Sequence, residues 1–189
     1  MTAAKILMCP PDHYGIEYEI NPWMDRRRTC HHELAVRQWM GLRQLLEANG
    51  ATVSCLAPVA GLPDLVFTAN AALIYGDLAI PANFRHPERQ GEQGHARQWL
   101  RDHGFQIHEL SGHLVFEGAG DALFCGDTLF AGYRMRSDIR AHREIADRLG
   151  CRVISLELVD PSYYHLDTCF CPLASGQARY STDLPLQYP

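Results

Sequence analysis

The sequence predicts an α/β fold built from repeated units of about fifty residues, each made of two strands, a helix and a third strand. Residues 72–77 read ALIYGD and residues 122–127 read ALFCGD, so a strand-turn-strand pattern recurs at an offset of fifty residues. A junction in which a helix ends near a glycine and a strand follows occurs three times, at residues 49–53, 103–107 and 149–153. Self-similarity at this period is typical of propellers and stacked arrays, so we expect about three and a half units of an α/β propeller in a single, incomplete domain over residues 1–189.

The first unit is the least complete of the predicted repeats. Residues 5–9 form a short apolar strand that ends at two prolines, and a loop rich in aromatic and acidic residues follows over 14–24. Loops of that composition often line functional sites. Thr29 is expected to cap a helix that runs to about residue 48, with a stripe of tryptophan and leucine side chains as its core face, and residues 52–57 form the next strand.

The second and third units follow the same order of elements. The second begins at residues 63–70 and continues with two strands around Gly76, a helix over 92–103 and a strand over 105–110. The third has two strands around Gly126, a helix from the cap Ser137 to residue 149 and a strand over 152–156.

The fourth unit begins at residues 165–171 and then fades, since residues 177–189 show no period. A propeller closes by placing its last blade beside its first. We therefore expect the missing blades to come from a partner chain, as in a homo-oligomer, or from a longer parent chain.

Composition is typical of a soluble globular protein of the cytosol. Hydrophobic residues make up 47% and charged residues 21%, and no apolar run approaches the ~20 residues of a membrane span. The net charge of -5 without a Lys/Arg run argues against nucleic acid or an anionic membrane as the main partner, and it fits a cationic small substrate. Seven cysteines without an export signal predict free thiols, mostly buried, rather than a disulfide framework.

Polar residues occupy equivalent places at the starts of successive units. They are Asp64 and Asn70, then Glu117 and Asp121, then His165 and Asp167. Equivalent positions in a ring of repeats point at the same axis, so we expect these side chains to converge. Carboxylates bind a planar guanidinium in forked geometry, and a histidine transfers protons near neutral pH. Arg85 and Arg134, near-equivalent in register, are candidates to hold a substrate carboxylate.

Less specific readings apply to the same residues. Each acidic residue taken alone fits a turn or a helix cap, and the two arginines fit exposed positions beside helix starts. Gly118-x-Gly120 could suggest a dinucleotide loop, but a strand follows it and the third glycine is absent. Cys30-His31-His32 with Cys169-x-Cys171 could suggest zinc, but the spacing fits no ordinary finger. We therefore expect neither a metal nor a cofactor.

Four motifs resemble the guanidino-group-modifying enzymes, also called the amidinotransferase and dimethylarginine dimethylaminohydrolase superfamily. They are residues 62–70 (LPDLVFTAN), 116–121 (FEGAGD), 165–168 (HLDT) and the lead-in 19–24 (EINPWM). The resemblance implies the five-bladed α/β propeller called the pentein fold. It also implies a covalent mechanism, in which a cysteine thiolate attacks the guanidinium carbon and a histidine protonates the leaving amine and activates water.

Residue by residue, the resemblance implies Glu117 and His165 as the catalytic pair, and Asp64 and Asp167 as residues that orient the substrate. Asn70 falls where arginine deiminases and dimethylargininases carry an aspartate. An amide there, with Asn21 in the lead-in, looks more like the arginine dihydrolases, which convert arginine to ornithine with release of ammonia and carbon dioxide.

One feature departs from this pattern. The family's nucleophilic cysteine lies in the last blade, and none of the seven cysteines here matches that position. The leading hypothesis is therefore a hydrolase of the guanidino group of arginine, inactive without that cysteine. Two alternatives stay open: an amidinotransferase, and a non-catalytic binding protein of the same fold.

Overall fold

The computed structural model describes residues 3–173 and 177–180. The chain divides into two compact units, Met1–Thr68 and Ala69–Pro189, here called the N-terminal and C-terminal units. Each is described by itself. No helix among the described residues is long and apolar enough to cross a membrane.

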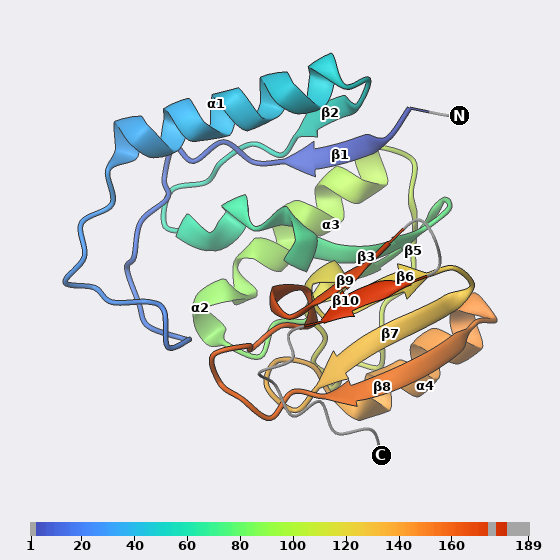
Figure 1. Cartoon of the computed structure of the whole chain (residues 1–189). Coiled ribbons are helices and arrows are strands. Elements are labelled where there is room, and N and C mark those ends of the chain that lie inside the picture. Colours follow the sequence, from blue (N-terminus) through green and yellow to red (C-terminus); the bar gives the residue numbers. More distant parts are fainter. Residues whose placement is uncertain (1–2, 174–176, 181–189) are drawn as a thin grey trace. The chain divides into compact units, whose positions relative to one another are not determined.

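The N-terminal unit is a strand-helix-strand motif. Strands β1 (Lys5–Met8) and β2 (Thr52–Cys55) pair in parallel, and helix α1 (His32–Ala48) connects them, followed by the short 3-10 helix η1 (Pro63–Val66) (Figure 1). A parallel pair needs such a crossover because its two strands run the same way.

Two expectations for α1 are wrong. The helix begins at His32 with His31 as its N-cap, so Thr29 does not cap it. None of its residues is buried, and Leu34, Leu42 and Leu45 are exposed, so the expected buried face of this helix does not form.

The C-terminal unit contains two three-stranded sheets of identical topology. The first has the order β3 (Ala72–Tyr75), β4 (Leu78–Pro81), β5 (Gln106–Ile107), and the second β6 (Ala122–Cys125), β7 (Thr128–Tyr133), β8 (Arg152–Glu157). In both, an antiparallel hairpin is followed by a parallel third strand. The predicted repeat of the second and third units is therefore confirmed, although β5 is much shorter than the expected 105–110.

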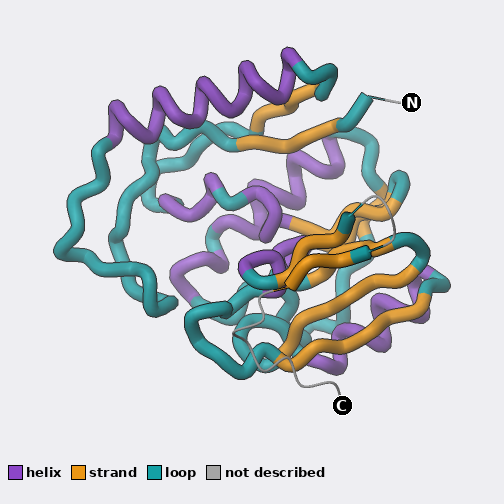
Figure 2. Tube along the Cα trace, in the orientation of Figure 1, coloured by secondary structure: helices purple, strands orange, loops and turns teal. Residues whose placement is uncertain are grey.

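Helices connect the second and third strands of each sheet. They are α2 (Pro87–Gln90) and α3 (Glu92–Asp102) in the first sheet and α4 (Ile139–Leu149) in the second. Figures 1 and 2 show α4 lying against the sheet of β6, β7 and β8. The cap of α4 is Asp138, which accepts a hydrogen bond from the backbone of Arg140, and not the expected Ser137.

An apolar cluster joins the two sheets. It includes Leu73 and Ile80 from the first sheet, Leu129 from the second and Ile145 from α4. The third 3-10 helix, η3 (Gly118–Gly120), precedes β6, and η2 (Thr68–Ala71) precedes β3. Asn70 lies in η2, and Glu117 and Asp121 flank η3, so the turns that carry these three residues adjoin the cluster.

The start of the fourth unit is also ordered. Helix η4 (Leu166–Thr168) leads into β9 (Phe170–Pro172), which pairs antiparallel with β10 (Ala178–Tyr180). Leu166, Cys169 and Phe170 pack with Leu156 and Leu158 in a second apolar cluster. The tail without a pattern was expected over residues 177–189. Strand β10 falls within it, and residues 181–189 lie outside the described residues.

All seven cysteines are free thiols, but the expectation that most are buried is wrong. Cys9 and Cys169 are buried, whereas Cys55 and Cys171 are exposed and the other three are intermediate.

His142 of α4 makes folding stability depend on pH. Its ring is buried, with Nδ1 2.8 Å from Ser155 Oγ and Nε2 3.2 Å from the carbonyl oxygen of Gly132. Burial lowers the pKa of His142 to about 4, against the opposing effect of the Gly132 carbonyl. The unfolded chain therefore binds a proton below pH 6.5 that the folded chain does not bind until about pH 4. Stability contributed by the neutral ring is complete above pH 6.5 and is lost as the pH falls through this window.

We expect this proton to reduce the free energy of unfolding by about 2 kcal/mol between pH 7 and pH 5. Urea titrations of the wild type and of His142→Gln at pH 7 and pH 5 give the change in the free energy of unfolding of each protein between the two pH values. The wild type should lose about 2 kcal/mol more than the variant. An equal change in the two proteins would contradict the prediction.

Candidate active site

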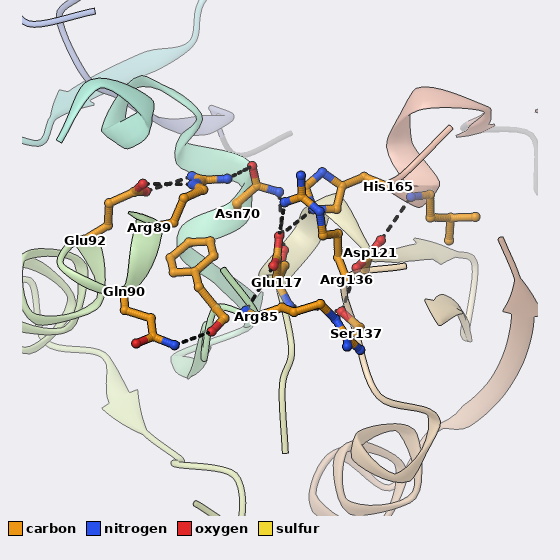
Figure 3. Close-up of polar contacts among 12 residues, drawn as sticks. Asn70, Arg85, Arg89, Gln90, Glu92, Glu117, Asp121, Arg136, Ser137 and His165 are labelled. Carbon is orange, nitrogen blue, oxygen red and sulfur yellow. Dashed lines mark hydrogen bonds and ion pairs between the residues drawn. The ribbon is translucent and has the colours of Figure 1, made fainter. Parts of the chain in front are cut away.

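Glu117 lies at the centre of a buried polar cluster in the C-terminal unit. Its side chain is fully buried, at 0% exposure. Oε2 lies 2.7 Å from Nε2 of His165 and accepts a hydrogen bond from Nη1 of Arg136 at 3.0 Å (Figure 3). Oε1 accepts one from the backbone N–H of Arg85 at 3.2 Å. The carboxylate thus holds an imidazole and a guanidinium at one oxygen.

The charge state of Glu117 follows from these partners. Burial alone would raise the pKa of its carboxyl, but the hydrogen bond to His165 and the charges of Arg136, His165 and Arg89 lower it to about 2. Glu117 is therefore ionised at neutral pH and can only accept hydrogen bonds. It follows that Nε2 of His165 carries the proton between the two groups.

Asp121 and Ser137 fix the backbone around Glu117. The backbone N–H of Glu117 donates to Ser137 Oγ at 3.0 Å, and Ser137 Oγ donates to Asp121 Oδ2 at 2.6 Å. Asp121 Oδ1 accepts the backbone N–H of Leu166 at 3.1 Å. Both oxygens of this fully buried carboxyl are thereby used inside the protein, where they tie the Glu117 turn to the His165 turn.

Burial raises the pKa of Asp121 to about 6, against the lowering effects of His165 and Ser137. Asp121 therefore binds a proton on folding between pH 3.8 and about 6, and its contribution to stability falls as the pH rises through that range. This trend opposes that of His142, so the pH experiment above must compare the wild type with the His142→Gln variant.

Asn70 borders the cluster on the side of η2. It is buried, its Nδ2 donates to the carbonyl oxygen of Glu117 at 3.4 Å, and its Oδ1 accepts from Nη1 of Arg89 at 3.0 Å. Figure 3 shows Asn70 between Arg89 and Glu117. Arg89 also forms a forked pair with Glu92 at 2.8 and 2.7 Å.

Contacts with neighbouring side chains also hold the turn that carries His165. Thr168 Oγ1 donates to the carbonyl oxygen of His165 at 2.6 Å, and the guanidinium of Arg136 lies 4.8 Å from the ring centroid of Tyr164. Asp167 reaches solvent, yet partial desolvation raises the pKa of its carboxyl and nearby His165 only partly offsets this. His165 itself is buried.

The structure brings together Asn70, Glu117, Asp121 and His165, four of the residues singled out from the sequence. The other five lie differently. Arg85 contributes its backbone N–H while its side chain is exposed, and Arg134 is exposed and paired with Glu157 at 2.7 Å. Asp167 is in the adjoining turn, and Asn21 and Asp64 belong to the N-terminal unit. There Asp64 is buried in η1, and Asn21 Oδ1 accepts the backbone N–H of Trp23.

Sequence reasoning missed Arg89, Glu92, Arg136 and Ser137. Arg136 lies two residues beyond Arg134, the arginine that the repeat register selected, and it points inward while Arg134 faces solvent. Arg89 and Glu92 carried a usable signal, since an arginine and a glutamate three residues apart meet wherever the backbone is helical, as it is at Gly91 between α2 and α3.

The Gly118-x-Gly120 stretch does not have the setting of a dinucleotide loop. Gly118–Gly120 is a 3-10 helix that runs into a strand, whereas a dinucleotide loop opens an α-helix. Across residues 3–173 and 177–180, no three His, Cys, Asp or Glu side chains are grouped to hold a metal ion.

Gly120 leaves room for the Asn70 amide. A Cβ at this position would lie 2.1 Å from Asn70 Nδ2 and 3.6 Å from Cγ of His165. We expect Gly120→Ala to lower the free energy of unfolding by about 1–3 kcal/mol, because the Asn70 side chain must leave Arg89. Chemical denaturation of Gly120→Ala alone and combined with Asn70→Ala measures this.

The second substitution should recover most of the loss, since both of the shortest contacts are to the Asn70 side chain. Gly41→Ala is the control, because a Cβ there meets nothing within 4 Å. Additive effects of the two substitutions would contradict the assignment of the clash to Asn70.

An ionised carboxylate that holds a protonated imidazole nitrogen is suited to bind a cation and to transfer a proton. The buried arginines beside it balance its charge. The cluster therefore offers both acid-base chemistry and charge recognition.

Comparison with known proteins connects this cluster to a family. The model of the family described as "N,N dimethylarginine dimethylhydrolase, eukaryotic" matches residues 16–179. The bifunctional arginine dihydrolase/ornithine cyclodeaminase AgrE of Nostoc sp. is 48% identical over 179 residues, covering 93% of this chain and 25% of the relative. The N(G),N(G)-dimethylarginine dimethylaminohydrolase of Mycobacterium tuberculosis is 44% identical over 176 residues, covering 93% of this chain and 58% of the relative.

Solved structures of similar proteins agree with these sequence comparisons. The N-terminal domain of ArgZ bound to substrate, an arginine dihydrolase from Cyanobacteria, superposes with a TM-score of 0.87 at 46% identity, covering 95% of this chain and 69% of that chain. A dimethylarginine dimethylaminohydrolase at 17% identity shares the fold with a TM-score of 0.77. The chain thus spans about a quarter of the length of its bifunctional relatives and somewhat over half of the Mycobacterium relative. By the family model and these likenesses together, the chain belongs to the N,N-dimethylarginine dimethylhydrolase family of the guanidino-group-modifying superfamily.

Proposed function

We propose that this chain binds the guanidino group of arginine or an arginine derivative and carries the acid-base part of a C–N hydrolase. The observation that supports this most directly is the buried Glu117–His165 pair at 2.7 Å. The relatives named above are arginine dihydrolases and dimethylarginine dimethylaminohydrolases, which supports the same reaction class.

The proposed reaction replaces a guanidinium nitrogen by oxygen. One C–N bond breaks, one C–O bond to water forms, and the nitrogen leaves as ammonia or an amine. Glu117 holds the cation and His165 delivers the proton to the leaving nitrogen and later accepts one from water. Asn70 as an amide favours arginine dihydrolysis, in which the ureido group formed first is hydrolysed again.

Other residues receive proposed roles in substrate binding. Asp64 and Asp167 orient the guanidinium, and Asn21 contributes from the loop of the N-terminal unit. Arg136 is a better candidate than Arg134 for a charge near the substrate, because Arg136 is buried beside Glu117. Asp121, with both oxygens used, holds the two turns in position.

The resemblance gives none of the cysteines the role of nucleophile, and the surroundings of Cys169 do not suit it to that role. Cys169 is the cysteine next to the His165 turn, and its Sγ donates to the carbonyl oxygen of Leu166. Burial raises the pKa of its thiol to about 11, so the thiolate is scarce at neutral pH. We propose that turnover requires a thiolate supplied by a further segment or chain, as a homo-oligomer or a longer parent chain would provide.

Calorimetric titration with L-arginine tests the binding proposal. The wild type should bind arginine, and His165→Ala should weaken this binding at least about tenfold if the site is the one described. Unchanged affinity in the variant would overturn the assignment.

A turnover assay distinguishes the alternatives. The chain, alone and with a complementing polypeptide, is incubated with arginine in the presence and absence of glycine. Citrulline or ornithine with ammonia supports hydrolysis, guanidinoacetate supports transfer, and binding without any product supports a binding protein.

We further propose that the two units are parts of one incomplete five-bladed propeller. The two three-stranded sheets of the same topology, both in the C-terminal unit, support the repeat on which this proposal rests. Trp39 lies in α1 and Trp99 in α3, so variants that retain only one of the three tryptophans report on one unit each. Coincident thermal transitions would support one domain, and two separate transitions would contradict it.

A further inference from the structure

Tyr164 contacts both of the side chains that meet at Oε2 of Glu117. The guanidinium carbon of Arg136 lies 4.8 Å from the centroid of the Tyr164 ring, and the imidazole centroid of His165 lies 4.9 Å from it, with the two rings inclined at 55°. Nη1 of Arg136 and Nε2 of His165 in turn lie 3.0 and 2.7 Å from the carboxylate oxygen (Figure 3). One aromatic ring therefore adjoins the cation and the imidazole that share one acceptor.

The turn after β8 places two neighbouring tyrosines against different parts of the C-terminal unit. Ser162 donates its backbone N–H to Asp160 Oδ1 at 2.8 Å, and Tyr163 donates its own to the carbonyl oxygen of Asp160 at 2.9 Å, which closes this turn. Tyr163 then packs against the second apolar cluster. Tyr164, the next residue, contacts the buried polar cluster instead. The chain thus supplies a matched pair of tyrosines, of which only one lies at the site.

The face of an aromatic ring attracts a cation without taking its directional hydrogen bonds. The N–H groups of Arg136 therefore stay available to the carboxylate, while the ring restricts the positions that the guanidinium can take. The ring of Tyr164 is half-buried and both side chains that it contacts are buried, so the attraction acts away from bulk water, where it is strongest. The hydrogen bond from Thr168 holds the backbone of His165, and the contact with Tyr164 acts on its ring.

We propose that Tyr164 is a positioning residue, whose ring keeps this guanidinium and this imidazole together on one oxygen of Glu117. The inference rests on the proposed function, because the Glu117–His165 pair is the observation that supports that function most directly. Without the ring, the guanidinium and the imidazole can move apart and water can enter between them and the carboxylate. An apolar side chain without a ring should therefore weaken ligand binding even where the fold is retained.

Calorimetric titration with L-arginine compares the wild type with Tyr164→Leu, Tyr164→Phe and Tyr163→Leu. Tyr164→Leu should weaken binding about tenfold, as for the loss of one desolvated contact between a cation and an aromatic ring. Tyr164→Phe keeps the ring that makes both contacts, so its affinity should stay within about threefold of the wild type. Tyr163→Leu is the matched control, because it removes the same kind of ring one residue away. It should lower the Tm while leaving the affinity within about twofold.

Nuclear magnetic resonance of the Arg136 side chain separates positioning from a general loss of stability. A guanidinium held in one orientation gives separate signals for its two Nη groups, whereas free rotation about the Nε–Cζ bond averages them. The Arg136 signals, assigned by their loss in Arg136→Lys, should be separate in the wild type, Tyr164→Phe and Tyr163→Leu, and averaged in Tyr164→Leu. If Tyr164→Leu does not fold, Tyr164→Met carries the same expectations, since its flexible side chain fills more of the space without a ring.

The failure of this inference and that of the proposed function are distinguishable. A wild type that does not bind arginine overturns the proposed function and this inference with it. If the wild type binds arginine, unchanged affinity in Tyr164→Leu or Arg136 signals that stay separate in that variant overturn the positioning role alone. A loss as large in Tyr164→Phe or in Tyr163→Leu has the same consequence, since the effect would then not belong to the ring of Tyr164.

Discussion

Glu117→Gln is expected to lower the free energy of unfolding at pH 7 by about 3–5 kcal/mol, because it leaves a buried cation without its counter-charge. The carboxylate accepts from three donors, on His165, Arg136 and the backbone of Arg85. A glutamine has one acceptor oxygen, so in either orientation its NH₂ meets a donor. Arginine binding should be lost as well, since the negative charge is gone.

Thermal unfolding measures the stability loss, which in a chain of this size corresponds to a fall in Tm of about 10 °C. Glu157→Gln is the matched control, since Glu157 also pairs with an arginine, Arg134, whose side chain is 56% exposed. That control should change stability by at most about 1 kcal/mol. A similar small change for Glu117→Gln would contradict the buried pair.

A double-mutant cycle separates the unpaired charge from the other effects. Adding Arg136→Met to Glu117→Gln removes the uncompensated cation and should recover part of the loss, with a coupling of about 1–3 kcal/mol. The pH profile gives a second check. The folded pKa of Glu117, about 2, lies below its ordinary 4.5, so its contribution to stability is present above 4.5 and is lost as the pH falls toward 2. The variant should lack that loss.

The repeat was readable from the sequence because hairpins and helix ends depend on local patterns. ALIYGD and ALFCGD became hairpins with the same register, in which Leu73 pairs with Ile80 and Leu123 with Phe130. The helix starts were less predictable. Ser137 has the right chemistry for a cap, but its hydroxyl bonds Glu117 and Asp121, so Asp138 caps α4 instead. A tertiary hydrogen bond overrode a local preference.

The sequence predicted those site residues that occupy equivalent positions in successive repeats. Glu117 and His165 meet although they are 48 positions apart, as equivalent places in successive units predict. The repeat register does not predict the direction of a side chain in an irregular turn. Arg134 has a φ of 88°, so the backbone turns sharply there and Arg136, two residues on, faces the carboxylate. No alternation rule applies through such a turn, so the repeat register does not predict which of the two arginine side chains faces inward.

Gly118→Ala is expected to be the most damaging alanine substitution among the glycines of the site. A Cβ there would lie 2.8 Å from the carbonyl oxygen of Asn70, 2.9 Å from that of Ala69 and 2.9 Å from the backbone nitrogen of Ala72. All three are backbone atoms, so no side-chain rotation relieves the clash. The φ of 64° adds the cost of a left-handed residue. We expect a loss of about 2–4 kcal/mol and a displaced Glu117 carboxylate.

Gly126→Ala separates the two causes. Gly126 has nearly the same φ, 59°, but a Cβ there meets nothing within 4 Å, so its alanine variant should lose only about 1–2 kcal/mol. Denaturant titrations give the difference between the two variants, which measures the close approach of the η2 backbone to the Glu117 turn. Truncation of the Asn70 side chain should not rescue Gly118→Ala, in contrast to Gly120→Ala. Equal losses at positions 118 and 126 would mean that the η2 turn moves away freely, and then the same contact could not hold Asn70 against Glu117.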